Sequence, residues 1–106
     1  MGFFSSIPSV SAAEAAQKLR EEGAVLVDVR SPDEFAEGHA QGASNCPLPV
    51  IDSCVDKLKN FNEVYVICQS GGRSSAAVSK LLLENVHAIN VAGGTAAWRS
   101  HGLPVS

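Results

Sequence analysis

The stretch Val64-Tyr65-Val66-Ile67-Cys68-Gln69-Ser70-Gly71-Gly72-Arg73-Ser74 decides how the rest of this chain is interpreted. Its first four residues favour a buried strand, and the polar loop after Cys68 leads into a helical pattern that begins at Ser74. Backbone N–H groups without a helical partner converge at a helix N-terminus, where the aligned peptide dipoles add positive charge. A cysteine at such a place, beside an arginine, has a pKa below its ordinary value of about 8.5. We therefore interpret Cys68 as a nucleophile.

The size and composition of the chain limit the classes of protein that it can belong to. Its 106 residues are enough for one hydrophobic core, so we expect a single domain over residues 1–106. A net charge of −3 without any basic run argues against a nucleic-acid partner, and no stretch is apolar over the length of a membrane span. Residues 1–6 lack a secretory signal, and although Gly2 and Ser6 fit a myristoylation pattern, we expect a loose terminus and a cytoplasmic protein without a membrane partner.

The three cysteines, Cys46, Cys54 and Cys68, form an odd set without a Cys-x-x-Cys pair. Such a set fits neither a disulfide framework nor a usual zinc site, so we expect a reducing compartment and no metal. Cys54 lies on an apolar helix face and is expected in the core, and Cys46 is expected to fill volume there. The alternative is that either cysteine closes a disulfide onto oxidised Cys68.

Apolar runs and helical periodicity alternate along the chain. Strands are predicted at residues 24–29, 43–46, 64–67 and 88–91, and helices at residues 11–23, 31–37, 51–58, 74–85 and 95–102. Ser11 with Glu14 and Ser31 with Glu34 are the capping signals of the first two helices. This alternation over short connections implies an α/β fold in which helices cover both faces of a parallel sheet.

Ligands of open parallel sheets bind beyond the carboxyl ends of the strands. Cys68 is expected at such an end, together with Asp28, Arg30 and the Gly93-Gly94 turn. We regard Asp28 and Arg30 as supporting residues, because a buried strand-end acid needs a partner and Arg30 could pair with Glu34.

Three groups of motifs together resemble the rhodanese family of sulfurtransferases. They are residues 26–35 with Gly38-His39 and Gly42-Ala43, residues 68–74, and Gly93-Gly94 followed by Ala97-Trp98 and residues 102–105. The resemblance covers nearly the whole chain and implies a rhodanese-like fold, with a central parallel sheet of about five strands flanked by helices on both faces. It also implies that Cys68 takes the outer sulfur of a small anionic donor such as thiosulfate, becomes a persulfide, and passes this sulfur to cyanide or a cellular thiol. No cofactor is expected.

The loop after Cys68 is the expected substrate-binding site, made of Gln69, Ser70, Gly71, Gly72, Arg73 and Ser74. Its backbone amides would surround the sulfur, and the glycines would let those amides come close. Arg73 would attract an anionic donor, while Ser70 and Ser74 could add hydroxyl donors. Arg73 could instead form a structural ion pair with Asp28 or another strand-end acid.

Two other functions are weighed against sulfur transfer with small donors. The chain could be a persulfide carrier or binding module that serves a sulfur-relay partner, such as a cysteine desulfurase. Phosphatases and arsenate reductases also place an arginine after a cysteine loop, but with five residues between them, whereas four separate Cys68 from Arg73. We expect this shorter loop to hold a sulfur atom rather than a phosphoryl group.

The remaining residues with reactive or aromatic side chains are given structural roles. His39 is expected to tie its turn to the preceding helix through its ring, and His87 and His101 are expected at the surface. Trp98 is expected in the core.

Overall fold

The computed structural model describes residues 7–106, so the signal and myristoylation patterns of residues 1–6 lie outside the described residues. Along the chain the elements are β1 (Ser9–Val10), α1 (Ala12–Lys18), β2 (Ala24–Asp28), α2 (Pro32–Ala36), β3 (Ser44–Asn45), the 3-10 helix η1 (Leu48–Cys54), α3 (Val55–Leu58), β4 (Glu63–Ile67), α4 (Gly72–Leu83), β5 (Ala88–Val91) and α5 (Gly94–Ser100). None of the helices in this part of the chain is long and apolar enough to cross a membrane.

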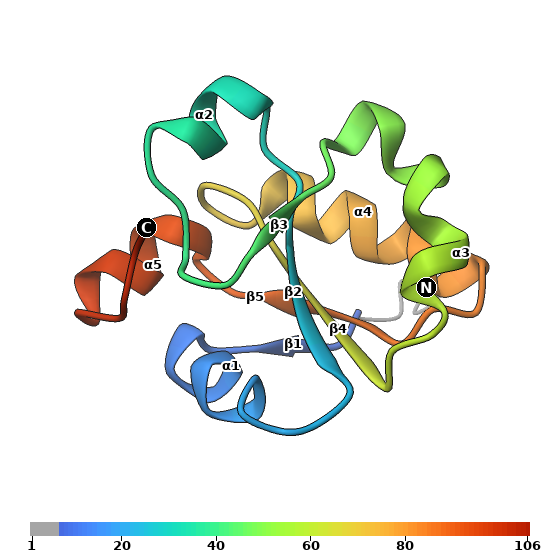
Figure 1. Ribbon diagram of the computed structural model, residues 1–106, viewed down its shortest axis with the longest axis horizontal. Helices are drawn as coiled ribbons and strands as arrows, with labels where there is room; N and C mark the ends of the chain where they lie inside the picture. Colours follow the sequence, from blue (N-terminus) through green and yellow to red (C-terminus); the bar gives the residue numbers. More distant parts are fainter. Residues whose placement is uncertain (1–6) are drawn as a thin grey trace, which may run out of the picture.

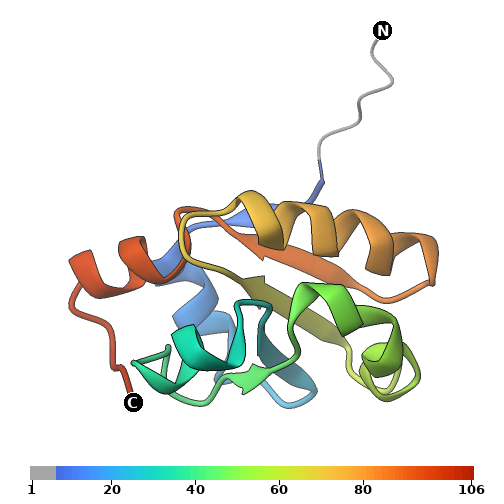
Figure 2. The ribbon, with the colours of Figure 1, turned by 90° about the horizontal axis from the view of Figure 1, so that it is seen from above.

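The five strands form one parallel sheet in the order β1-β5-β4-β2-β3 (Figure 1). Helices cover both faces of this sheet, and α5 and α3 lie at opposite ends of the molecule in both views (Figures 1 and 2). The α/β fold class predicted from the sequence is confirmed.

Strand β4 occupies the centre of the sheet because both of its faces are apolar. Val64 and Val66 belong to a core with α4, η1 and α3, which we call the α4 face. Tyr65 and Ile67 belong to a second core with α1 and α5, which we call the α1 face. A parallel strand covered on both sides needs such a continuous apolar run, since successive side chains point to opposite faces.

The predicted helix boundaries differ from the structure by up to five residues, and two of the differences involve glycines. The first helix ends at Lys18 rather than at Gly23, and Gly23 (φ +87°) lies in the turn before β2. Helix α4 begins at Gly72 rather than at Ser74, with Gly71 at its N-cap in a left-handed conformation. Because glycine adopts this conformation without a steric penalty, the helix can begin immediately after the loop.

The predicted helix over residues 51–58 consists of two shorter helices. The 3-10 helix η1 ends at Cys54 and α3 follows it, with Val50 in a non-helical conformation (φ −118°). Because the residue before a proline is disfavoured in the α conformation, Leu48 before Pro49 is a poor start for a regular α-helix. Ile51, Val55 and Leu58 are nevertheless buried against the α4 face.

Strand β1 was not predicted from the sequence. It has only two residues, and Pro8 precedes them, so no apolar run marks it. Ser9 and Val10 pair with Asn90 and Val91 of β5 and form one edge of the sheet.

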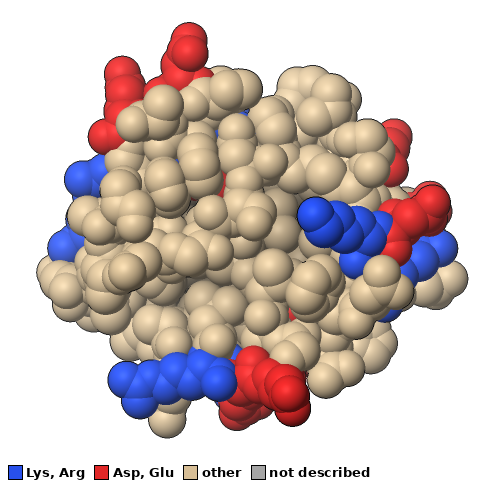
Figure 3. All heavy atoms as spheres, in the orientation of Figure 1, with Lys and Arg blue, Asp and Glu red and all other residues tan. Residues whose placement is uncertain are grey.

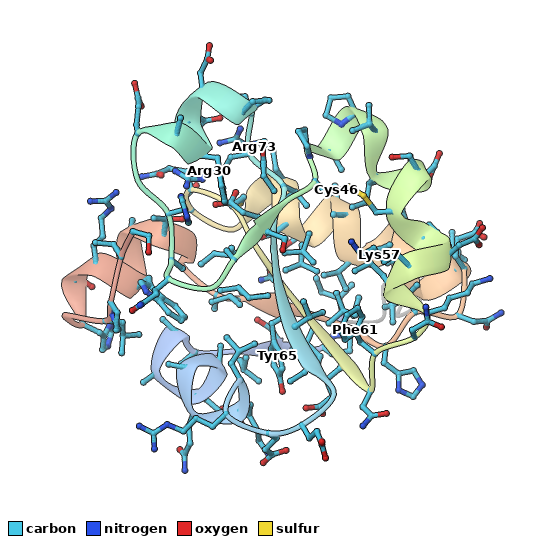
Figure 4. All side chains as sticks on the ribbon, viewed as in Figure 1. Arg30, Cys46, Lys57, Phe61, Tyr65 and Arg73 are labelled. Carbon is cyan, nitrogen blue, oxygen red and sulfur yellow. A yellow bond between two sulfur atoms is a disulfide. The ribbon has the colours of Figure 1, made fainter. Side chains whose placement is uncertain are left out.

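Cys46 and Cys54 form a disulfide with each other, so the predictions that the cysteines form no disulfide framework and that these two only pack in the core are wrong, and neither is bonded to Cys68. Cys46 follows β3 and Cys54 ends η1, which folds back and brings the two Cα atoms to 7.0 Å (Figure 4). Their separation of eight residues matches no short cysteine motif, so only the η1 turn brings them together. Cys68 is the free cysteine of residues 7–106, and the inference of a reducing compartment from unpaired cysteines loses its basis.

The buried charges at the end of β2 pair with each other. The Arg30 side chain donates to the Asp28 carboxylate from Nε (3.0 Å to each oxygen) and Nη2 (2.8 Å), and Nη2 also donates to the Gly38 carbonyl (2.7 Å). Both side chains are buried, at 0% and 4% exposure. The predicted pairing of Arg30 with Glu34 is wrong, because residues two apart on an extended chain point to the same side and Asp28 is therefore nearer.

Other structural roles predicted from the sequence are confirmed. The His39 ring stacks on Phe35, and its Nδ1 lies 2.8 Å from the Phe35 carbonyl. Trp98 is buried and donates from Nε1 to the Pro104 carbonyl, whereas His87 and His101 are exposed.

Replacing Asp28 should destabilise the fold strongly. Asp28→Asn leaves the Arg30 guanidinium buried without a counter-charge, which should lower the free energy of unfolding by about 3 kcal/mol or more. The matched control is Asp52→Asn, since Asp52 and Lys80 are both exposed and 3.7 Å apart, and this change should cost less than about 1 kcal/mol. Urea unfolding measures both, and equal losses would contradict the assignment.

Titration of the free thiols tests for the Cys46–Cys54 disulfide. Protein denatured without reductant should react with Ellman's reagent at one thiol per chain, and at three after reduction. Because the disulfide closes a loop of about nine residues, reduction should lower the free energy of unfolding by about 2.5 kcal/mol. A double variant, Cys46→Ser with Cys54→Ser, should not respond to the reductant. Three reactive thiols before reduction would refute the bond.

Candidate active site

Cys68 lies where the sequence predicts it, between the end of β4 and the start of α4. Its Sγ accepts a hydrogen bond from the Gly71 N–H at 3.1 Å and lies 3.3 Å from the Ser74 Oγ. Gly71 holds a φ of +117°, which turns the chain so that its N–H returns toward the sulfur. Cys68 is 1% exposed, whereas Gln69 and Ser70 above it are exposed. The thiol is therefore at the base of a short polar loop.

The surroundings of Cys68 favour the thiolate. Burial raises the pKa of the thiol, but hydrogen bonds from the Ser74 hydroxyl and from the N–H groups of Ser74, Gly71 and Ser70 outweigh burial and lower the pKa below its ordinary value. The N-terminus of a twelve-residue helix, α4, adds its dipole in the same direction. Ser70 thus acts through its backbone N–H.

The turn between β5 and α5 holds the loop after Cys68 in place through hydrogen bonds to its backbone carbonyls. Thr95 donates to the Cys68 carbonyl from its N–H (2.8 Å) and its hydroxyl (3.0 Å), and the Ala96 N–H donates to the Gln69 carbonyl at 3.1 Å. A Cβ atom at Gly94 would lie 2.5 Å from the Cys68 carbonyl oxygen, so only glycine fits there. The predicted meeting of Cys68 with the Gly93-Gly94 turn is confirmed. The role of Thr95 was missed, although its place just after two glycines at a helix start was a usable signal.

Arg73 pairs with a residue that the sequence did not suggest. Its Nη1 and Nη2 donate to the two carboxylate oxygens of Glu34 at 2.7 and 3.0 Å. Glu34 belongs to the first turn of α2, so the predicted pairing with a strand-end acid is wrong. The hydrogen bonds from Arg73 lower the pKa of Glu34 to about 2, and the same contact raises the pKa of Arg73. The Arg73 and Glu34 side chains remain 41% and 34% exposed, so this ion pair is accessible to solvent.

Both arginines at this end of the sheet already carry a carboxylate partner. Figure 4 shows Arg30 and Arg73 above the end of the strands, and Figure 3 shows acidic side chains over α2. Asp28 and Arg30 lie beside the loop and hold each other, as expected for supporting residues. The groups within hydrogen-bond distance of the Cys68 sulfur are the Gly71 N–H and the Ser74 hydroxyl, and neither arginine is among them.

Asn90 is a second polar residue that sequence reasoning missed. It lies in β5 on the α4 face, 6% exposed, and its Oδ1 is 2.5 Å from the Ser74 Oγ. An amide within the apolar run of residues 88–91 was the signal that could have identified it. Within residues 7–106, no group of three histidine, cysteine, aspartate or glutamate side chains is placed to hold a metal ion.

Comparison with known proteins gives one consistent result. The model of the Rhodanese-like domain family matches residues 11–101. A sulfurtransferase of Allochromatium vinosum is 31% identical over 101 residues, covering 93% of this chain and 94% of that protein. Thiosulfate sulfurtransferase 16, chloroplastic, of Arabidopsis thaliana is 33% identical and covers 94% of both.

A putative sulfur carrier protein of Bacillus subtilis, YrkF, is 32% identical over 89% of this chain and 52% of its own length. Among solved structures, the rhodanese-related protein of Thermoplasma volcanium superposes with a TM-score of 0.84 at 29% identity, covering 93% of this chain and 97% of that one.

Proposed function

The chain belongs to the rhodanese-like domain family, and we propose that it is a sulfurtransferase that carries sulfane sulfur as a persulfide on Cys68. The observation that carries the proposal is the Gly71 N–H that donates to the Cys68 sulfur at 3.1 Å, with the Ser74 hydroxyl within hydrogen-bond distance of the same sulfur at 3.3 Å. A backbone donor that is fixed in advance stabilises an anionic sulfur without reorganisation.

In the first step the Cys68 thiolate attacks the outer sulfur of the donor. A new S–S bond forms as the donor's own S–S bond breaks, so thiosulfate leaves sulfite and Cys68 becomes a persulfide anion. In the second step cyanide or a thiol attacks the outer persulfide sulfur, and Cys68 departs as a thiolate. This is covalent catalysis in two half-reactions, and neither half-reaction needs an external oxidant or reductant.

The loop suits a sulfur atom rather than a larger group. Four residues separate Cys68 from Arg73, and the thiol is 1% exposed, so only the outer atom of a donor need reach it. Gln69 and Ser70 are exposed, and the Gly71 N–H lies 3.1 Å from the sulfur. We expect no hydrolysis of an aryl phosphate.

A second candidate function is that of a persulfide carrier that receives sulfur from a partner enzyme such as a cysteine desulfurase. The pairing of Arg73 with Glu34 favours it, because this pairing weakens attraction for a small dianion, and the sulfur-carrier relative is consistent with it. Turnover with thiosulfate alone, compared with turnover when a cysteine desulfurase and cysteine are present, separates the two functions.

The cytoplasmic location of the protein stays a prediction.

Treatment with thiosulfate should load one sulfur atom onto Cys68. Intact-protein mass spectrometry should show a gain of one sulfur, peptide mapping should place it on Cys68, and later addition of cyanide should remove it as thiocyanate. Cys68→Ser should abolish both the gain and the thiocyanate, while Cys54→Ser should keep them. A gain on Cys46 or Cys54 would falsify the assignment.

Freeing Arg73 should improve the use of thiosulfate. Glu34→Gln removes the charge that occupies the guanidinium, so the KM for thiosulfate should fall about fivefold, which corresponds to about 1 kcal/mol for an exposed ion pair. Asp33→Asn, an equal change of charge at the neighbouring exposed position, should have little effect. Arg73→Ala should raise the KM about tenfold. Steady-state thiocyanate formation measures the KM of all three variants. Equal effects of Glu34→Gln and Asp33→Asn would contradict a specific role for the Arg73–Glu34 pair and would indicate a general effect of net charge.

A further inference from the structure

A line of polar side chains runs from Cys68 to the edge of the sheet. The Cys68 Sγ lies 3.3 Å from the Ser74 Oγ, and the Ser74 Oγ lies 2.5 Å from the Asn90 Oδ1. On its other side Asn90 reaches the Ser9 Oγ of β1, 3.4 Å from Nδ2. Cys68, Ser74 and Asn90 are 1%, 0% and 6% exposed, so water contributes little to their hydrogen bonding.

The Ser74 hydroxyl has a single proton and more than one acceptor within reach. Its nearest acceptor is the Asn90 Oδ1, and the Gly71 carbonyl lies farther away at 3.2 Å. When the proton points to Asn90, the Ser74 oxygen can only accept from the sulfur. This direction suits a Cys68 thiol, which donates its S–H, and it opposes a thiolate, because two lone pairs would then face each other.

A Cys68 thiolate requires the hydrogen bonds between Asn90, Ser74 and Cys68 to have the opposite donor-to-acceptor direction. Ser74 must then donate to the sulfur, and its oxygen needs a donor in place of the Asn90 carbonyl. A half-turn of the Asn90 amide supplies one, because it exchanges Nδ2 with Oδ1 and leaves the carbonyl to accept from the Ser9 hydroxyl. Every polar group then keeps a partner in both directions, which matters because a buried unpaired group costs about 1–3 kcal/mol.

We propose that Asn90 is a positioning residue whose side-chain amide turns over when Cys68 loses its proton, which lets Ser74 donate to the thiolate. An amide can serve both states because it presents a donor and an acceptor on opposite sides. A carboxylate can only accept, and an apolar side chain can do neither. The inference rests on the proposed role of Cys68 as the nucleophile, because only a residue that changes charge requires such a reversal.

The charged groups around Cys68 come from elements other than β5. Asp28 and Arg30 lie at the end of β2, Glu34 lies in α2, and Arg73 lies in α4, and these four form two ion pairs. The pKa of Glu34 is about 2, so this carboxylate stays ionised from pH 5 to 10. Two further titratable or charged groups are His39, whose Nδ1 lies 2.8 Å from the Phe35 carbonyl, and Arg99 in the last turn of α5. Cys68→Ser removes the thiol and keeps all of these groups, so it separates their effects from the titration of Cys68.

The direction of the amide can be observed by NMR in the unmodified protein. At low pH the Asn90 side-chain NH2 protons should show a nuclear Overhauser effect to the Ser9 β-protons, and above the pKa of Cys68 this contact should move to the Ser74 β-protons. The Asn45 amide is the internal control, because its Nδ2 donates to the Asp28 and Arg30 carbonyls (2.9 and 3.0 Å), neither of which can reverse. Asn90 contacts that stay the same across the titration, or that move equally in Cys68→Ser, would overturn the proposal.

A pair of variants tests whether Asn90 acts through Ser74. Asn90→Asp offers only acceptors, so it should hold the Ser74 proton away from the sulfur and raise the apparent pKa of Cys68, measured from the pH dependence of alkylation, by about one unit or more. In a Ser74→Ala background the same change should raise it by clearly less. Equal rises in both backgrounds would indicate a direct charge effect and refute the proposal. Persulfide loading, measured on the same proteins, reports separately on the proposed sulfur transfer.

Discussion

The hydrogen bond from the Gly71 N–H to the Cys68 sulfur is the interaction on which the arrangement of this end of the molecule depends. A sulfur anion buried in a protein is tolerated only where donors already point at it, and here they come from the loop itself. For the loop to curl around one atom, Gly71 must be left-handed, α4 must start at once, and the β5–α5 turn must receive the Cys68 and Gln69 carbonyls. The loop, α4 and the β5–α5 turn thus together fix the backbone around the Cys68 sulfur.

The arginines near Cys68 are not free to bind an anion, although the residue types suggest that they are. Two arginines near a cysteine in the sequence suggest an anion-binding site. In the structure, however, Arg30 forms an ion pair with Asp28 and Arg73 forms one with Glu34. Of the two pairs, the one between Arg30 and Asp28 is buried, whereas the one between Arg73 and Glu34 is partly exposed to solvent. Fixed backbone amides therefore stabilise charge at the sulfur, while the Arg73 guanidinium of α4 is paired with Glu34 of α2.

Much of this could be predicted from the sequence, because the informative signals were local. The apolar run of β4, the capping box of α2 and the glycines around Cys68 each determine structure within a few residues, and the motifs of the family extend this to the sheet. The failures concern contacts between segments far apart in the sequence. Periodicity carries no information on which acid Arg73 meets, whether η1 folds Cys54 onto Cys46, or that Ser74 faces Asn90.

The shortness of the two outer strands has a consequence for how these molecules meet one another. Strands β1 and β3 have two residues each, and the Cys46–Cys54 bond fastens η1 beside β3. An exposed sheet edge is a template on which a second chain can add a strand, and long edges promote aggregation. Within residues 7–106, each edge offers a template only two residues long, so we expect little edge-to-edge polymerisation of this protein even at high concentration.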